Sequence, residues 1–233
     1  MIDKDFETFV YISFEKILIC IFSKKNSKIL YMDECKSLEA NNQISKNRIV
    51  DFLNSNIFKI EKQLNSLIYD LNLIINSNQF KSVNLSIKQN INLDEISQKE
   101  QINLLNELKN EIKNNYPNYS IIHYIINHYL FDDNIQKHFD ISQKCNHLCL
   151  DATFIILNKQ DIFFYKKIFE KFQISVEKII CGQYIFDILG SNKLNECEMG
   201  LKISSGFNPN EVFLIKKSIE KKGFFERFFN FFN

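Results

Sequence analysis

The side chains best suited to binding a metal lie in one short segment near the middle of the chain. Cys145, His147 and Cys149 alternate along it, and alternate residues of a β-strand point to the same face of a sheet. Thiolate and imidazole groups are typical zinc ligands. However, this spacing differs from the two-residue spacing of a zinc knuckle, and the sequence offers no evident fourth ligand. We therefore predict no metal site here.

Other groups capable of catalysis occur without the patterns that catalysis needs. His123 and His128 lie among isoleucine and tyrosine residues, a setting typical of packing or strand-edge residues. The chain contains no Gly-x-Ser-x-Gly motif, no cysteine–histidine nucleophile pattern and no Walker loop. The sequence therefore favours a protein that is not an enzyme and carries no cofactor.

In the first third of the chain, apolar patterns predict strands around one long helix. Phe9–Phe22 is a continuous apolar run, Lys24–Ser27 reads as a turn and Ile29–Met32 resumes the apolar pattern, which predicts a β-hairpin. From Asn47 to Asn76 apolar residues recur every three or four positions, which predicts a single long amphipathic helix. A helix that covers a sheet is favoured over a partner-binding coiled-coil seam. Lys81–Ile87 alternates polar and apolar residues and is expected as a strand of the same sheet as Phe9–Phe22.

The middle of the chain predicts a smaller unit of strands and one helix. Ser97 and Glu100 have the spacing of a capping box, and an apolar stripe continues to about Asn115. The expected buried residues of this helix are Ile102, Leu105, Leu108 and Ile112. Further strands are predicted at Tyr119–Phe131, His147–Leu157 and Ile174–Cys181, and further helices at Asp161–Phe172 and Gln183–Leu189. The fold class is therefore mixed α and β, of the α+β type.

The last eleven residues form the most distinctive pattern of the chain. On a helix their six phenylalanines share one arc of roughly 160°, with polar residues opposite. The segment is too short to span a bilayer, which needs about 20 apolar residues, and suits a helix lying in the membrane interface. Nearby basic residues would meet anionic lipid. The expected membrane-binding residues are Lys216, Lys217, Lys221, Lys222, Phe224, Phe225, Arg227, Phe228, Phe229, Phe231 and Phe232.

The residues before this segment predict where the tail begins. Asn208 as an N-cap and Pro209 at the first helical position predict a helix over residues 208–222, and Gly223 is a candidate hinge. The aromatic face has two alternatives to a membrane: the protein's own core, or the groove of a partner protein.

Composition sets further bounds on the function. The chain has 233 residues, of which 45% are hydrophobic and 24% charged, as in an ordinary globular protein. Its net charge of +1 supplies no general basic field, so we expect no nucleic-acid partner. The N-terminus lacks the pattern of a signal peptide, and six unevenly spaced cysteines indicate reduced thiols. We expect the chain in the cytosol.

The order and character of these segments resemble the front half of the actin-like bacterial cell-division protein FtsA. The family's opening strand pair is similar to FVYISFEKILICIFSKKNSKILYMDE, and the strand leaving its first subdomain is similar to FKSVNLSI. The helix and two strands of its inserted subdomain resemble DEISQKEQINLLNELKNEI, SIIHYIINHYLFDD and HLCLDATFIILN. The helix, strand and helix that return to the first subdomain resemble DIFFYKKIFEKFQISVEKIICGQYIFDIL. The entry to the second half resembles NECEMGLKI, and the tail resembles the family's membrane-targeting helix.

The resemblance implies a division of the chain and half of an actin-like fold. Residues 1–88 and 158–201 would form the first subdomain, and residues 89–157 the inserted strand-helix-strand-strand subdomain. Residues 202–210 would be a linker and residues 211–233 the amphipathic membrane-targeting tail.

Departures from the family concern its nucleotide site. The family's phosphate-binding hairpin contains glycine, whereas Tyr11–Lys16 has none and carries a phenylalanine in the turn. The second phosphate loop should follow a strand at Gly200–Ile203, where only Ser204-Ser205-Gly206 stands. The second half of the family's fold is missing. We therefore predict no ATP binding, no ATPase activity and no actin-like filaments. FtsZ is a possible partner only, because the family binds it through the missing half.

The sequence thus predicts a shortened FtsA-like adaptor. It would be attached peripherally to the cytoplasmic face of the cell inner membrane, contact anionic lipid, and act in the bacterial division machinery by binding other division proteins. The alternative is a soluble complex subunit whose phenylalanine-rich C-terminal helix docks in a partner's groove.

Overall fold

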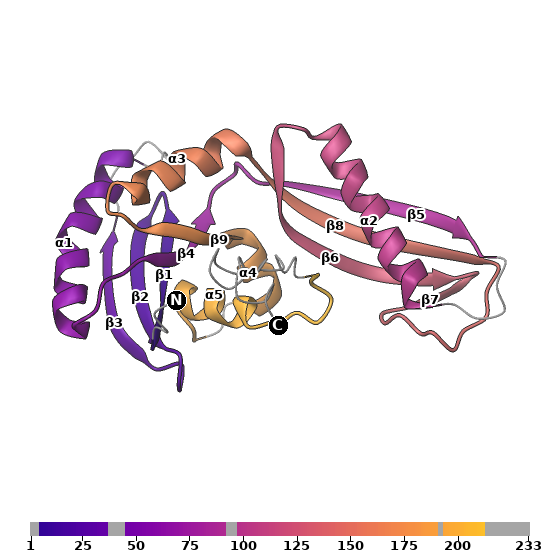
Figure 1. The fold of residues 1–233 in the computed structure, drawn as a ribbon, viewed down its shortest axis with the longest axis horizontal. Coiled ribbons are helices and arrows are strands. Elements are labelled where there is room, and N and C mark those ends of the chain that lie inside the picture. Colours follow the sequence, from indigo (N-terminus) through magenta and orange to yellow (C-terminus); the bar gives the residue numbers. More distant parts are fainter. Residues whose placement is uncertain (1–4, 37–44, 92–96, 191–192, 213–233) are drawn as a thin grey trace, which may run out of the picture.

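The chain forms two β-sheets that lie end to end, each covered by helices (Figure 1). The structure is a computed structural model that describes residues 5–36, 45–91, 97–190 and 193–212. The expected mixture of strands and helices is therefore confirmed.

The first sheet has five strands in the order β3-β2-β1-β4-β9. Their bounds are β1 Phe6–Ser13, β2 Lys16–Ser23, β3 Ile29–Lys36, β4 Asp70–Asn76 and β9 Ser175–Cys181. β1, β4 and β9 run parallel, whereas β1, β2 and β3 form an antiparallel meander. The apolar run Phe9–Phe22 thus contains two strands, β1 and β2, joined by a tight turn at Phe14 and Glu15. Together with β3 they form a three-stranded meander where the sequence predicted a two-stranded hairpin.

The first sheet is the middle layer of three. α1 (Lys46–Leu64) and α3 (Lys159–Glu170) cover one face, and α4 (Gly182–Leu189) and α5 (Glu196–Ser204) cover the other. Along β1, Val10 and Ile12 pack toward the first pair of helices, while Phe9 and Tyr11 pack toward the second. Because both faces are covered, the central strands read as continuous apolar runs.

The single long helix predicted for Asn47–Asn76 is wrong in its second half. α1 ends at Leu64, and Asn65 takes the left-handed conformation with φ of 47°. β4 then begins at Asp70, and its buried interior from Leu71 to Ile75 is a central parallel strand. Four of the five residues from Leu71 to Ile75 are apolar, so a three-to-four spacing also fits this run and does not distinguish strand from helix.

The second sheet has four antiparallel strands in the order β5-β8-β6-β7. Their bounds are β5 Lys81–Asn90, β6 Tyr119–Phe131, β7 Asn134–Gln136 and β8 His147–Asn158. α2 (Gln98–Asn115) covers one face of this sheet through Leu104, Leu108 and Ile112. The predicted strand Lys81–Ile87 exists, but it belongs to this sheet and not to the sheet of Phe9–Phe22.

The sequence correctly predicted the bounds of α2 but not all of its buried residues. The predicted capping box is confirmed, because Ser97 and Glu100 bond to each other's backbone. The expected burial of Ile102 is wrong, since its side chain is 54% exposed and Leu104 takes the inward position. Leu105 is half-buried at the edge of the same core.

Residues beyond β9 differ most from expectation. Gly200–Ile203, expected as a strand, forms part of α5, whose own capping box joins Asn195 and Glu198. Residues 202–204 of the expected linker 202–210 are the last turn of α5, and Asn208 is buried. The helix predicted to begin at Pro209 does not begin there: residues 209–210 form a turn and Glu211 pairs with β6.

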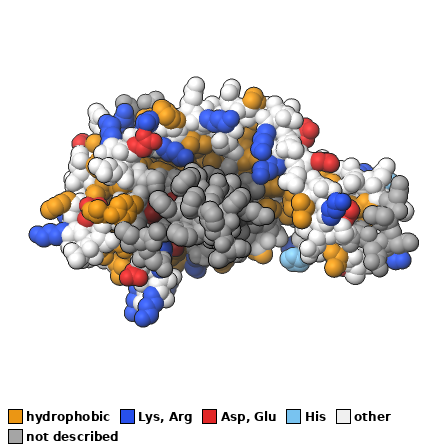
Figure 2. Space-filling view, viewed as in Figure 1, with side chains coloured by type: hydrophobic (Ala, Val, Ile, Leu, Met, Phe, Trp, Pro, Cys, Tyr) orange, Lys and Arg blue, Asp and Glu red, His pale blue; other side chains and the backbone are white. Residues whose placement is uncertain are grey.

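Basic and acidic side chains are interspersed over the described part of the face shown in Figure 2. On that face, the side chains described show no large field of one sign of charge.

Candidate functional site

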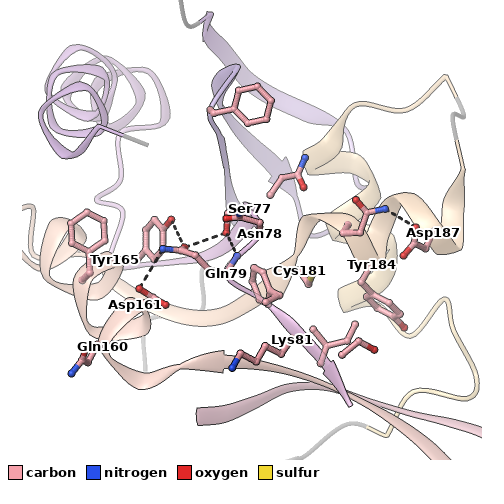
Figure 3. A pocket seen from close by; sticks show the side chains of 17 residues that line it. Ser77, Asn78, Gln79, Lys81, Gln160, Asp161, Tyr165, Cys181, Tyr184 and Asp187 are labelled. Atoms are coloured by element: carbon pink, nitrogen blue, oxygen red, sulfur yellow. Dashed lines mark hydrogen bonds between the residues drawn. The ribbon is translucent and has the colours of Figure 1, made fainter. Parts of the chain in front are cut away.

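A pocket of about 1310 Å³ opens where the parallel strands of the first sheet end. β4 ends at Asn76 and β9 at Cys181, and both residues line the pocket beside Phe14 of the β1–β2 turn. The start of β5 and the first turns of α3 and α4 complete the wall (Figure 3). In open α/β sheets, ligands bind in the crevice outside the carboxyl ends of the strands. This pocket is therefore the first candidate site.

The polar side chains of this pocket are mainly amides and carboxylates that bond to one another. Gln79 donates to Asp161 Oδ1 over 3.3 Å, and the Tyr165 hydroxyl donates to Gln79 Oε1 over 3.4 Å. On the other wall, Gln183 donates to Asp187 over 2.8 Å (Figure 3). The lining contains two carboxylates and one lysine, Lys81. Such a wall suits a polar or peptide ligand better than a polyphosphate, which is attracted by cations and free amide groups.

The β1–β2 turn occupies the position of the phosphate hairpin in the FtsA resemblance. The Ser13 hydroxyl oxygen accepts hydrogen bonds from the backbone N–H groups of Glu15 at 3.2 Å and Lys16 at 3.1 Å. The same hydroxyl donates to the Lys16 carbonyl at 3.2 Å. The amide groups that would approach a phosphate are thus already bonded within the turn.

The cation of this turn is also engaged. Lys16 Nζ lies 3.0 Å from Glu196 and 3.4 Å from Glu34, so the turn is joined to the start of α5 and to β3. Burial lowers the pKa of Lys16, but its bonds to Glu196 and Glu34 outweigh burial and leave the pKa raised. Lys16 therefore stays charged and paired at neutral pH.

A second polar cluster is buried where the two sheets meet. His123 of β6 and Glu211 are joined by a 2.6 Å contact between Nδ1 and Oε1, with side chains only 3% and 5% exposed. The other ring nitrogen, Nε2, accepts a hydrogen bond from the backbone N–H of Cys181 at 3.0 Å. These partners place the proton of His123 on Nδ1. One imidazole thus links the second sheet, the end of β9 and the C-terminal segment.

Tyr184 of α4 completes this cluster. Its ring lies 4.3 Å from the His123 ring, and its hydroxyl donates to Glu211 Oε2 over 2.8 Å. The amide of Asn208 donates to the same hydroxyl over 2.9 Å. Burial raises the pKa of Tyr184, so the hydroxyl stays protonated and available as a donor.

Backbone bonds fix the same segment to β6. The N–H of Ile126 donates to the Asn210 carbonyl over 2.8 Å, and the N–H of Val212 donates to the Tyr124 carbonyl over 2.7 Å. The segment 208–212 is therefore held both by its side chains and by its backbone. Val212, the last residue that the structure describes, is thereby fixed at the junction of the two sheets.

The cluster lacks the geometry of a cysteine nucleophile site. His123 Nε2 is occupied by the backbone N–H of Cys181 and not by its thiol. Burial raises the pKa of the Cys181 thiol, which disfavours the reactive thiolate. The arrangement of Cys181, His123 and Glu211 therefore supports a structural joint.

The candidate metal ligands of the sequence have different surroundings in the structure. Cys145 is buried in the core under α2, whereas His147 Nδ1 contacts Asn90 Oδ1 at 2.9 Å. Cys149 is half-buried, and its thiol lies 4.0 Å from Asp151. Among the described residues no group of three or more histidine, cysteine, aspartate or glutamate side chains is placed to hold a metal ion.

The structure describes some of the residues singled out in the sequence but not the predicted membrane-binding residues. His123 is buried, as a packing residue is expected to be, and His128 pairs with Asp151 at a half-exposed position. All eleven predicted membrane-binding residues, from Lys216 to Phe232, lie outside the described residues. Within the described residues no helix is both long and apolar enough to cross a membrane.

The sequence did not predict the joint between the sheets. His123 and Glu211 are separated by 88 positions, and neither belongs to a local motif. The only local signal was a histidine among isoleucine and tyrosine residues, which indicates burial but does not identify a partner.

No protein-family model and no curated protein matches the sequence. Solved structures match it in fold. The cytoplasmic domain of EpsL, an inner membrane component of the type II secretion system of Vibrio cholerae, is 7% identical with a TM-score of 0.38, over 77% of this chain and 57% of that one. The PilM–PilN type IV pilus biogenesis complex matches at 7% identity and a TM-score of 0.44, over 78% and 49%.

A third solved structure is a Bacteroides thetaiotaomicron protein with an actin-like ATPase fold and unknown function. It is 15% identical with a TM-score of 0.31, over 81% of this chain and 58% of that one. The chain spans about half to three fifths of the length of these three proteins. Each likeness concerns the fold alone.

Proposed function

We propose that this chain is a non-enzymatic adaptor of the bacterial cell-division machinery, held peripherally on the cytoplasmic face of the inner membrane by its C-terminal tail. The observation that supports the proposal is the fixed position of Glu211 and Val212, the last described residues before that tail. Glu211 is buried between His123 and Tyr184, and Val212 is paired with β6.

The fixed position of Val212 determines how membrane binding by the tail would orient the protein. Residues 213–233 follow Val212 directly and contain the six phenylalanines and the lysines of the amphipathic pattern. Each large aromatic ring buried in the acyl boundary stabilises binding by about 1.5–3 kcal/mol, and each lysine near anionic lipid by about 1 kcal/mol. Since Val212 is fixed at the joint of the two sheets, membrane binding by residues 213–233 would keep both sheets close to the lipid surface.

We propose a non-enzymatic role because the polar groups of the pocket and of the β1–β2 turn are already engaged. The turn amides are bonded to the Ser13 hydroxyl, Lys16 is paired with Glu196, and the pocket wall carries carboxylates. None of these groups is free to stabilise a phosphate. The same pocket is large enough for a polar segment of a partner protein, which is the role that an adaptor requires.

The assignment to cell division rests on the sequence resemblance to FtsA. We propose division proteins as the partners. FtsZ is a possible partner only, because the resemblance implies that the family binds it through its second half. A fluorescent fusion of the full chain should gather at the division site of the bacterium that encodes it. Even distribution along the membrane would contradict the division role and leave the membrane role intact.

Vesicle sedimentation tests the membrane role directly. The full chain should sediment with vesicles that contain anionic lipid and much less with purely zwitterionic vesicles. A chain that stays in the supernatant with both would contradict the membrane role and favour docking of the tail in a partner's groove.

A further inference from the structure

The edge strand β5 is long and regular, and no other described strand pairs with its outer side. It spans Lys81–Asn90 and pairs with β8 over ten consecutive residues with no break in register. Ile91, the next residue, donates its N–H to the Asn146 carbonyl, which continues the same register. In an antiparallel pair, such bonded positions alternate with positions whose backbone groups point away. The outward groups therefore belong to the even residues Ser82, Asn84, Ser86, Lys88 and Asn90.

Other edges of the two sheets are protected. On β3 the carbonyls of Leu30 and Cys35 accept bonds from the side chains of Gln63 and Arg48. At the end of β9 the N–H of Cys181 bonds to His123, and β7 is only three residues long. Within the described residues, by contrast, no side chain bonds to the backbone of β5. Proteins normally blunt a long regular edge, because it is a template for another strand.

The side chains of β5 are complementary to a second copy of the same strand. Val83, Leu85 and Ile87 pack against the α2 core but remain half-buried. If two β5 strands pair antiparallel about a two-fold axis at Leu85, Val83 lies opposite Ile87 of the second copy and the two Leu85 side chains meet. Leu85 would then be at a non-hydrogen-bonded position, where opposite side chains are closest.

The charges of β5 allow the same register. In this pairing Lys81 lies opposite Gln89 of the second copy, and Lys88 lies opposite Ser82, so no lysine faces another. Lysine on an edge strand discourages unspecific pairing, and here it leaves the two-fold register available. We propose that β5 is a homodimer interface that joins two copies of this chain into one continuous eight-stranded sheet.

A proline at an outward position tests this interface. Ser86→Pro removes an N–H that points away from β8, and proline is tolerated at such an edge position. Ser86→Ala keeps the N–H and serves as the matched control. Both are made in the full chain carrying Phe228→Glu and Phe232→Glu, so that association through the aromatic tail does not interfere.

Here the parent is the full chain that carries Phe228→Glu and Phe232→Glu alone. Sedimentation velocity over an approximately 100-fold range of concentration should show a monomer–dimer equilibrium for this parent and for Ser86→Ala. Ser86→Pro should weaken dimerisation at least tenfold while its circular dichroism stays unchanged. In the parent, hydrogen exchange of the peptide 81–90 should slow as concentration rises. A parent that is monomeric throughout, a dimer without slowed exchange in 81–90, or a folded Ser86→Pro dimer would each overturn the proposal. If Ser86→Pro unfolds, the exchange measurement on the parent decides alone.

Discussion

His123 and Glu211 are 88 residues apart and form a 2.6 Å contact in the interior. The imidazole comes from the second sheet, and its other nitrogen accepts the N–H at the end of β9 in the first sheet. The carboxylate comes from the segment that precedes the tail. A single imidazole therefore joins the two sheets to the segment 208–212.

Replacing Glu211 by alanine should destabilise the whole protein. The change leaves His123 Nδ1 and the Tyr184 hydroxyl without their acceptor, and each buried unpaired group costs about 1–3 kcal/mol. We expect the free energy of unfolding in urea to fall by about 2–4 kcal/mol. Glu177→Ala, on the exposed side of β9, is the matched control and should change it by less than about 0.5 kcal/mol. Equal effects of the two variants would show that the joint does not stabilise the fold.

Sequence patterns predicted elements whose signals are local and missed those set by distant contacts. The capping box of α2 and the strand Tyr119–Phe131 were found because their signals lie within a few residues. The end of α1 was missed because β4 is buried on both faces and reads as an apolar run compatible with either element. The joint at His123 depends on a partner 88 positions away, which no local pattern can indicate.

Nucleotide binding is expected to be absent. Titration of the full chain with Mg-ATP in a calorimeter should give no saturable heat, because the turn amides are bonded to Ser13 and Lys16 is paired with Glu196. A dissociation constant in the micromolar range would contradict this prediction and would reopen the question of enzymatic activity. Mg-ADP titrated in the same way distinguishes a weak ATP site from a product site.

Close contact at Gly200 should make α5 sensitive to one added methyl group. A Cβ at Gly200 would lie 2.3 Å from Ile74 Cδ1 and 3.0 Å from Ile74 Cγ1. Gly200→Ala should therefore cost about 1–3 kcal/mol of unfolding free energy through overpacking. Ile74→Val removes the Cδ1 atom, so the double variant should be more stable than the sum of the two single effects predicts. Additive effects in urea unfolding would contradict the contact.

The strand expected at Gly200–Ile203 rests on the resemblance to the FtsA family, which implies that the entry to the family's second half begins near Gly200. In the structure the same glycine lets a helix approach Ile74 and Phe9 of the first sheet. Gly200 therefore allows α5 to pack closely on the first sheet. The sequence alone does not distinguish this role from that of a glycine in a phosphate-binding loop.

The tail carries the clearest functional pattern, and its two central rings provide the final test. Phe228→Glu together with Phe232→Glu places two charges in the middle of the apolar arc. Loss of two buried rings should weaken binding to anionic vesicles by roughly 3 kcal/mol or more, which is over 100-fold in affinity. The remaining binding should fall with added salt, since the lysines act at a range of about 10 Å at 0.1 M ionic strength.

Asn230→Glu with Asn233→Glu adds the same charge on the polar arc of the tail and is the matched control. It should retain most of the vesicle binding, because the aromatic arc is intact. Both variants should melt at the temperature of the parent, since the aromatic rings are proposed to contact lipid and not the folded unit. A double phenylalanine variant that aggregates or melts at a much lower temperature would place the tail in the protein's own core. In that case the membrane role would be wrong.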